Sequence, residues 1–109
     1  MILNLSKKYC EACNGNTNPL SGIEILEYLK ELNSWSVNDE SEMIFKKFEF
    51  KNFKEACNFS NLVAKLSEDE GHHPDISLGW GYCIIMLHTH SIKNLSINDF
   101  IMASKIDLI

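Results

Sequence analysis

Residues 43–87 read MIFKKFEFKNFKEACNFSNLVAKLSEDEGHHPDISLGWGYCIIML, and this stretch decides the fold. It opens with an alternating pattern typical of a strand over residues 43–50, in which every second side chain shares one face. A long helical pattern follows between Asn52, a good N-cap, and Gly71, a good C-terminal stop. Two more strand patterns lie at residues 76–79 and 82–89. The unbroken apolar run in the second of these predicts a central strand that is buried on both faces.

Segments on either side of this stretch complete the domain. Ser21-Gly22-Ile23-Glu24 has the form of a capping box and predicts a helix over about residues 22–33. A short strand is expected at residues 35–37 and a last helix from Ser96 onward. Hairpin-like connections favour antiparallel pairing. The sequence therefore predicts an α+β fold: a single domain with a four-stranded antiparallel sheet and three helices packed on one face. Residues 1–20 form an N-terminal loop or loose arm, and residues 21–109 form the domain.

The long helix carries two apolar stripes, where a helix that only covered a sheet would need one. One stripe holds Phe53, Ala56, Cys57, Ser60, Val63 and Ala64, and the other holds Phe59, Leu62 and Leu66. A second stripe is typical of a helix that also packs on another helix. We therefore expect a homodimer or homotetramer that associates through the helix at about 53–70.

Composition narrows the function classes. All ten basic residues among the 109 are lysines, and fifteen acidic residues give a net charge of −5. A negative chain without arginine is poorly suited to neutralise a phosphate backbone, so we expect no nucleic-acid partner. No apolar run approaches the roughly 20 residues of a membrane helix, so no membrane partner is expected. The N-terminus lacks the order of charged and apolar residues of a signal peptide, and a cytoplasmic location follows as the default.

The four cysteines leave one alternative open. Cys57 and Cys83 lie in apolar patterns that are typical of small buried hydrophobes. Cys10 and Cys13 form a lone C-x-x-C, which is half of a zinc site without a second half at the usual spacing. Metal binding and free thiols on the arm are both compatible with this pair.

Histidines are the strongest functional signal. All four fall within nineteen residues, as His72, His73, His88 and His90. The first two lie in a loop that Pro74 stiffens, and the last two point to the same face of a strand. Such a cluster suits either acid–base chemistry, with an aspartate orienting one imidazole, or a metal site. The metal site would take the His-x-His pair and one ligand from the loop, with room for a carboxylate as a fourth. Spacing alone does not separate the two.

Ordinary structural roles compete for the other candidates. Asp99 stands in Ser96-x-x-Asp99, which is itself a capping box. Glu68 could belong to a solvated helix face, and Trp80 could serve packing alone.

A family resemblance favours the acid–base alternative. The chain places an acidic residue, three spacers, His-His-Pro, five spacers, an aromatic residue, nine spacers, a histidine, eight spacers and an aspartate in that order. This pattern resembles the signature of the pterin-4a-carbinolamine dehydratases. The residues that match it are Glu68, His72, His73, Pro74, Trp80, His90 and Asp99. The resemblance extends over essentially the whole chain, and the Cys10–Cys13 arm is similar to one seen in many bacterial members.

The resemblance implies a hydro-lyase that needs no metal or other cofactor. It would convert a 4a-hydroxytetrahydropterin to quinonoid dihydropterin and water, and so help to recycle the tetrahydropterin cofactor. A general acid would protonate the 4a oxygen while a base takes the proton from N5. The catalytic residues implied are His72, His73, His90 and Asp99, and the substrate-binding residues are Glu68, Pro74, Trp80 and Thr89.

Two positions depart from the pattern, and two other functions compete with the enzyme. His88 stands where relatives usually carry a small hydroxyl residue, and Asn94 replaces a common glycine; asparagine tolerates a left-handed backbone there. One competing function is a metal-binding histidine cluster. The other is a non-catalytic pterin-binding or coactivator-like module, since animal members of the family bind a homeodomain transcription factor through a helix.

Overall fold

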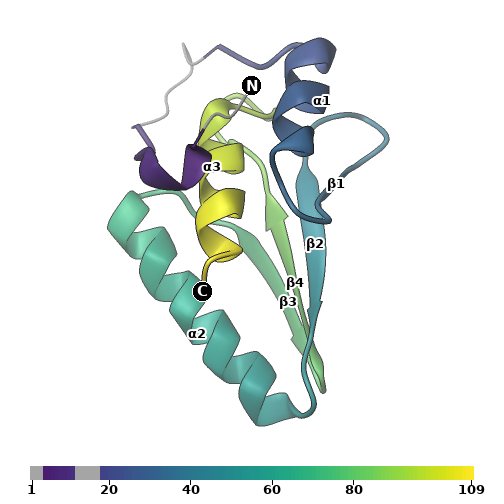
Figure 1. Cartoon of the computed structure of the whole chain (residues 1–109), viewed down its shortest axis with the longest axis vertical. Helices are drawn as coiled ribbons and strands as arrows, with labels where there is room; N and C mark the ends of the chain where they lie inside the picture. The colour runs from purple at the N-terminus through teal and green to yellow at the C-terminus, as the bar shows by residue number, and fades with distance from the viewer. Residues whose placement is uncertain (1–3, 12–17) are drawn as a thin grey trace.

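A computed structural model of the chain describes residues 4–11 and 18–109. Figure 1 shows a sheet with helices against one of its faces, and α2 and α3 lie side by side there. The elements in chain order are the 3₁₀ turn η1 (Leu5–Lys7), α1 (Gly22–Lys30), β1 (Ser36–Val37), β2 (Ile44–Glu49), α2 (Phe53–Glu70), β3 (Asp75–Gly79), β4 (Tyr82–Leu87) and α3 (Ile97–Ile106).

The four strands form one sheet in the order β1-β2-β4-β3, and every neighbouring pair is antiparallel. This confirms the predicted α+β fold with its four-stranded antiparallel sheet. It also confirms the central position of the apolar strand β4. Burial on both of its faces is not found, because only Cys83, Ile85 and Leu87 are fully buried while the alternate side chains are half-buried. The helices cover one face of the sheet, and the other face keeps partial contact with solvent.

Local signals explain the boundaries of α2. The side chain of Asn52 accepts the backbone N–H of Glu55 at 2.8 Å, and Gly71 ends the helix with a left-handed φ of 67°. The interpretation of two apolar stripes is wrong in detail. The buried face draws on both, since Ala56 and Val63 come from one stripe and Phe59 from the other. Ser67 completes that face.

α1 and α3 pack against one another as well as on the sheet side. Ser21 and Glu24 form the predicted capping box, and α1 ends at Lys30, three residues earlier than expected. The ring centroids of Tyr28 on α1 and Phe100 on α3 lie 5.3 Å apart. Phe100 is fully buried, which places α3 at the centre of the core.

Residues 4–11 are not a loose arm. Leu5 is 3% exposed and belongs to the main core, where η1 packs on α3. The backbone N–H of Cys10 donates to Glu70 at 2.9 Å, and that of Glu11 donates to the side chain of Asn98 at 3.1 Å. Leu5 and these hydrogen bonds anchor the segment. The sequence did not predict this, because a single buried leucine forms no periodic pattern. Cys13 lies outside the described residues.

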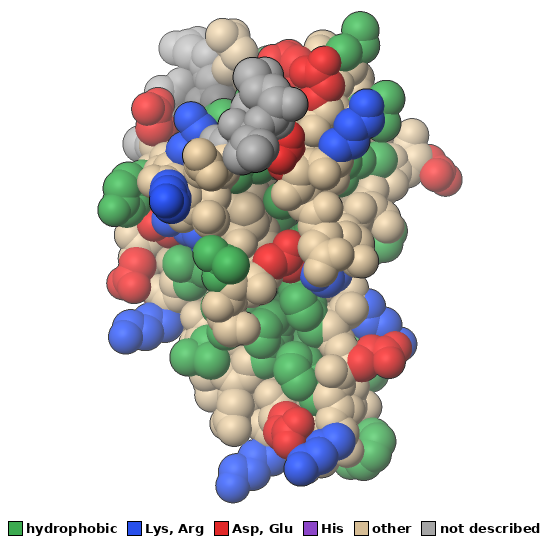
Figure 2. All heavy atoms as spheres, in the orientation of Figure 1, with side chains coloured by type: hydrophobic (Ala, Val, Ile, Leu, Met, Phe, Trp, Pro, Cys, Tyr) green, Lys and Arg blue, Asp and Glu red, His purple; other side chains and the backbone are tan. Residues whose placement is uncertain are grey.

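Figure 2 shows one face of the molecule, on which acidic and lysine side chains are interspersed around the periphery. Hydrophobic side chains gather below the middle of this face, over the region between α2 and the sheet. Within residues 4–11 and 18–109, no helix is both long enough and apolar enough to span a bilayer.

Candidate functional site

The predicted site residues other than Trp80 converge at the end of the sheet where β3 begins and β4 ends. Antiparallel pairing sets Asp75, the first residue of β3, opposite Met86 near the end of β4. The loop from α2 to β3 carries His72 and His73 to this end, and the chain leaving β4 brings His88 and His90. The first turn of α3 adds Asp99. Three segments that are distant in sequence therefore meet here.

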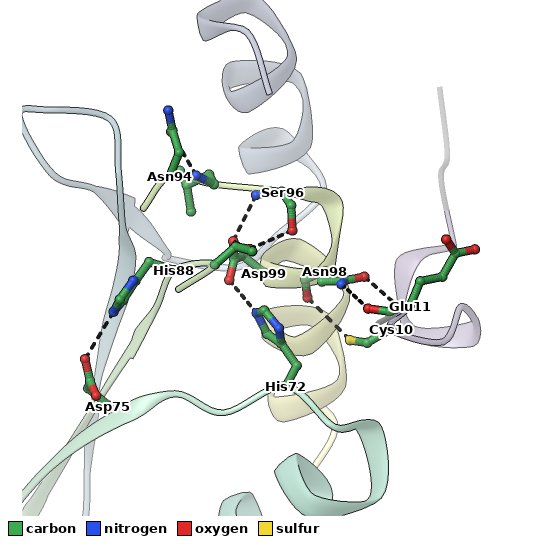
Figure 3. Close-up of polar contacts among 11 residues, drawn as sticks. Cys10, Glu11, His72, Asp75, His88, Asn94, Ser96, Asn98 and Asp99 are labelled. Atoms are coloured by element: carbon green, nitrogen blue, oxygen red, sulfur yellow. Dashed lines mark hydrogen bonds and ion pairs between the residues drawn. The ribbon is translucent and has the colours of Figure 1, made fainter. Parts of the chain in front are cut away.

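His72 and Asp99 form a buried pair. The imidazole Nε2 lies 2.7 Å from Oδ1 of the carboxylate, and the two side chains are 7% and 0% exposed. Figure 3 shows His72 pointing up from its loop to the start of α3. An ionised carboxylate only accepts hydrogen bonds, so we assign the proton of this contact to Nε2. In the neutral imidazole, Nδ1 is then the acceptor.

The second carboxylate oxygen of Asp99 binds the start of α3 and the chain before it. Its Oδ2 accepts the backbone N–H of Ser96 at 3.0 Å (Figure 3). The same oxygen accepts the hydroxyl of Thr89 at 2.8 Å. The Thr89 and Ser96 hydroxyls also lie 2.7 Å apart. Both interpretations of Asp99 therefore hold at once: one oxygen satisfies the N-terminus of α3 and the other orients a histidine. All members of this network are buried.

His73 faces the surface instead. Its Nε2 contacts a carboxylate oxygen of Glu68, one turn back on α2, and the two side chains are 59% and 76% exposed. Glu68 thus belongs to the candidate site through His73, as a partner at its rim. Pro74 is half-buried between this exposed imidazole and β3.

His88 and His90 pack against each other, with ring centroids 4.1 Å apart. His88 Nε2 also lies 3.3 Å from Oδ2 of Asp75 (Figure 3). Neither loop histidine joins this group, because His72 turns inward to Asp99 and His73 turns to Glu68. The metal site expected from the sequence, which needed one ligand from the His72–His73 loop, is therefore not assembled.

Trp80 is not brought to this end. It lies in the turn between β3 and β4 and is 73% exposed. Five residues of strand at about 3.3 Å each separate it by roughly 16 Å from the start of β3. Within one chain, Trp80 thus lies far from the other residues that the resemblance implies for substrate binding. Thr89, expected to bind substrate, is fully buried in the single chain, and its hydroxyl donates to Asp99.

Sequence reasoning paired Ser96 with Asp99 as a capping box but missed Asp75 as a partner of His88. The signal for Asp75 was present in the strand register: a residue opposite Met86 is the diagonal neighbour of position 88 on the same face. The turn between β4 and α3 also differs from expectation, because its left-handed residue is Lys93, with φ 52°, and not Asn94. Asn94 instead accepts the backbone N–H of Thr89 at 2.8 Å through its own carbonyl.

Cys10 lies near the start of α3, with its Sγ 3.6 Å from the carbonyl oxygen of Asn98 (Figure 3). Burial, and then the nearby negative charge of Glu70, raise the pKa of the Cys10 thiol to about 12. Burial likewise raises the pKa of Cys83, which is fully enclosed in the core. Both thiols remain protonated near neutral pH.

Comparisons with known proteins agree with this architecture. The family profile described as pterin 4 alpha carbinolamine dehydratase matches residues 18–109. Two relatives provisionally named pterin-4-alpha-carbinolamine dehydratase come from Methylococcus capsulatus and Rickettsia bellii. The first is 44% identical over 94% of this chain and 90% of its own, and the second is 46% identical over 96% and 93%.

Two solved structures are similar as well. A transcriptional coactivator/pterin dehydratase from Brucella melitensis superposes with a TM-score of 0.79 at 32% identity, over 84% of this chain and 97% of that one. A pterin dehydratase-like protein described as a RuBisCO assembly factor in the alpha-carboxysome gives 0.60 at 28% identity, over 70% and 88%. With a family match over residues 18–109 and relatives this similar over nearly their whole length, the chain belongs to the pterin-4-alpha-carbinolamine dehydratase family.

Proposed function

We propose that this protein dehydrates a 4a-hydroxytetrahydropterin to quinonoid dihydropterin and water, and thereby returns the pterin to the cofactor cycle. One observation carries the proposal. A buried His72–Asp99 pair lies at the end of the sheet where exposed His73 and His90 also lie. Family membership supports the same reaction class.

The reaction requires two proton transfers and no redox step. The C4a–O bond breaks, the proton on N5 leaves, and a C4a=N5 double bond forms. Hydroxide is a poor leaving group, so an acid must protonate the 4a oxygen while a base accepts the N5 proton. Imidazoles have reference pKa values near 6.5 and can fill both roles at neutral pH. Residues of this chain suffice for the step, which is why no cofactor is proposed.

We assign the two transfers to the exposed imidazoles, His73 and His90, which a bound pterin can reach. His72 is 6% exposed, and its hydrogen bond to Asp99 fixes the direction of its Nδ1 lone pair. A substrate that contacts this imidazole therefore meets it in a single orientation. Glu68 supports His73 in the same way at the rim. Each of these contacts fixes an orientation before substrate arrives, which reduces the entropic cost of reaching the transition state.

The decisive experiment follows the absorbance change of carbinolamine dehydration, with enzyme that has been treated with a chelator and with untreated enzyme. Fast turnover in the chelated sample supports acid–base catalysis by the chain alone. Loss of activity on chelation would assign the histidines to an essential metal. No activity in either sample would leave the fold a binding role.

His90→Ala tests the assignment directly. We expect dehydration to fall by about 10²- to 10⁴-fold, the usual contribution of a general acid or base. Ser91→Ala, at the adjacent exposed position, is the matched control and keeps its activity. Near-full turnover of the His90 variant would remove that residue from the mechanism.

We further propose that the protein works in the cytoplasm as a homodimer or homotetramer assembled through α2. Leu62, a large apolar side chain of this helix, is 52% exposed in the single chain. Contact with a second copy along this side of α2 would remove Leu62 from water, with a gain of roughly 25 cal/mol for each Å² buried.

A further inference from the structure

We propose that Asp75, His88 and His90 bind one divalent transition-metal ion, of which Zn²⁺ is the best fit, and that the bound ion switches the dehydratase off. The proposal differs from the metal alternative in the sequence, because its third ligand is Asp75 and not a histidine of the His72–His73 loop. It also gives a role to His88, which the dehydration does not use.

The ligand atoms are already close to the required spacing. One possible ligand atom from each residue lies within 4.8 Å of the other two. Two ligands that are each about 2.1 Å from a tetrahedral ion lie about 3.4 Å apart. His88 Nε2 and Asp75 Oδ2 meet that spacing, since they lie 3.3 Å apart. The distances from the His90 ligand atom to those of His88 and Asp75 need to shorten by at most about 1.4 Å. Rotation of the exposed His90 imidazole can supply this change.

The fold holds these residues together without help from a metal. β3 and β4 pair in a fixed register, so Asp75 and His88 leave the sheet on the same face. The rings of His88 and His90 are in contact in a tilted arrangement, with their centroids 4.1 Å apart. A surface hollow of about 410 Å³, also lined by Glu42 and Lys93, borders the two histidines and gives an ion and its waters access from solvent.

The donor set selects the class of ion. Two imidazoles and one carboxylate suit Zn²⁺ and its first-row neighbours, whereas Ca²⁺ and Mg²⁺ prefer oxygen ligands alone. Three protein ligands leave at least one position for water, as in open zinc sites. His88 is the member that completes the site, since without it only one imidazole and one carboxylate remain.

His90 belongs both to the proposed metal site and to the proposed proton transfers, so metal binding would affect the reaction. A metal ion takes the ring nitrogen lone pair that an imidazole needs as a base, and keeps it from delivering a proton as an acid. The inhibitory part of the proposal therefore rests on the proposed dehydratase, while the binding part does not. The two parts need separate measurements.

Binding is measured by titrating Zn²⁺ against a chromogenic chelator of known affinity. The background is Cys10→Ser/Cys13→Ser, which removes the thiols of the arm as competitors. We expect one ion per chain in this background. His88→Ser and Asp75→Asn should each weaken that binding by at least about tenfold, and Asp69→Asn, an exposed carboxylate on α2, should leave it unchanged. Equal affinity in the His88 and Asp69 variants would overturn the site.

Inhibition is measured on the same proteins. His88→Ser should turn over at the normal rate without metal, and Zn²⁺ at a concentration that saturates the parent should inhibit it at least tenfold less. Undiminished inhibition in His88→Ser would show that the ion acts elsewhere. If the parent protein proves inactive as a dehydratase, the binding titration still decides the site, and only the regulatory consequence falls.

Discussion

Asp99 accepts a hydrogen bond from His72 through one carboxylate oxygen and caps α3 through the other. The two residues are 27 positions apart, and both are buried. A single side chain thus ties the loop after α2 to the helix that fills the core. The orientation of the histidine and the start of α3 are consequently set by the same group.

Asp99→Asn should reduce both activity and stability. An amide cannot accept at both ends, so its NH₂ group must face either His72 or the Thr89–Ser96 pair. One donor then loses its acceptor, which costs about 1–3 kcal/mol. With NH₂ toward His72, the imidazole must move its proton to Nδ1 and lose the acceptor it offers there. We expect a fall of at least tenfold in kcat.

Asp107→Asn separates these effects. Asp107 lies on the same helical path, where it accepts from Trp35 Nε1 at 3.1 Å and Lys46 Nζ at 2.8 Å. It is eight residues beyond Asp99, or roughly 12 Å along the helix. Thermal unfolding should show a comparable loss of stability while dehydration stays normal. If both variants lose activity in proportion to stability, Asp99 has only a structural role.

His73→Ala should abolish most of the activity and leave the fold intact. The side chain is 59% exposed and contacts Glu68 at the surface, so its removal creates no cavity. Exposed substitutions of this kind change stability within about 0.5 kcal/mol. Dehydration should fall by about 10²- to 10⁴-fold. Steady-state turnover and a thermal melt decide the matter; a variant that melts normally and turns over normally contradicts the assignment.

Periodicity and capping signals predicted the fold of this chain well. Ser21, Asn52 and Gly71 fixed the ends of two helices because each satisfies backbone groups locally, and local chemistry is visible in sequence. The faces of α2 were harder to assign. Which apolar residues become buried depends on where the sheet and α3 lie, so Phe59 entered the core while Leu62 did not.

The residues of the candidate site were predicted, but most of their contacts were not, because contacts depend on how the elements pack. Spacing identified the histidines, and the family signature added Asp99, but neither gives the partner of a side chain. His88 pairs with Asp75 only because the β3–β4 register places both on one face. The family signature placed Trp80 with the site, whereas within one chain the β3–β4 hairpin turns it to the far end of the sheet.

Leu62→Glu should lower the mass of the assembly to that of a single chain if α2 is the contact between subunits. Leu62 is 52% exposed, whereas Leu66 is half-buried and packs on the core, so only the first separates assembly from folding. A charge buried at an interface without a partner is strongly unfavourable. Lys65→Glu, on an exposed polar position of α2, is the control. Light scattering that shows the same mass for parent and Leu62→Glu would exclude this face.

Cys10 should resist alkylation until the pH is very high. Because burial and Glu70 raise the pKa of its thiol to about 12, the thiolate fraction at pH 8 is about 10⁻⁴, against about 10⁻¹ for a thiol with a pKa of 9.0. The folded state holds this proton more tightly than the unfolded state. Stability from this group is therefore complete below about pH 9 and is lost as the pH rises toward 12.

Iodoacetamide labelling followed by peptide mass spectrometry measures this protection. In the folded protein at pH 8, Cys10 should react about a thousandfold more slowly than in denatured protein, and the rate should rise about tenfold per pH unit. Glu70→Gln removes the negative charge and weakens the acceptor of the Cys10 N–H, so labelling should accelerate. Asp69→Asn removes a charge from the same helix without touching Cys10 and should change nothing. Rapid labelling of Cys10 in the folded parent would mean that residues 4–11 detach from α3 faster than the thiol ionises in place.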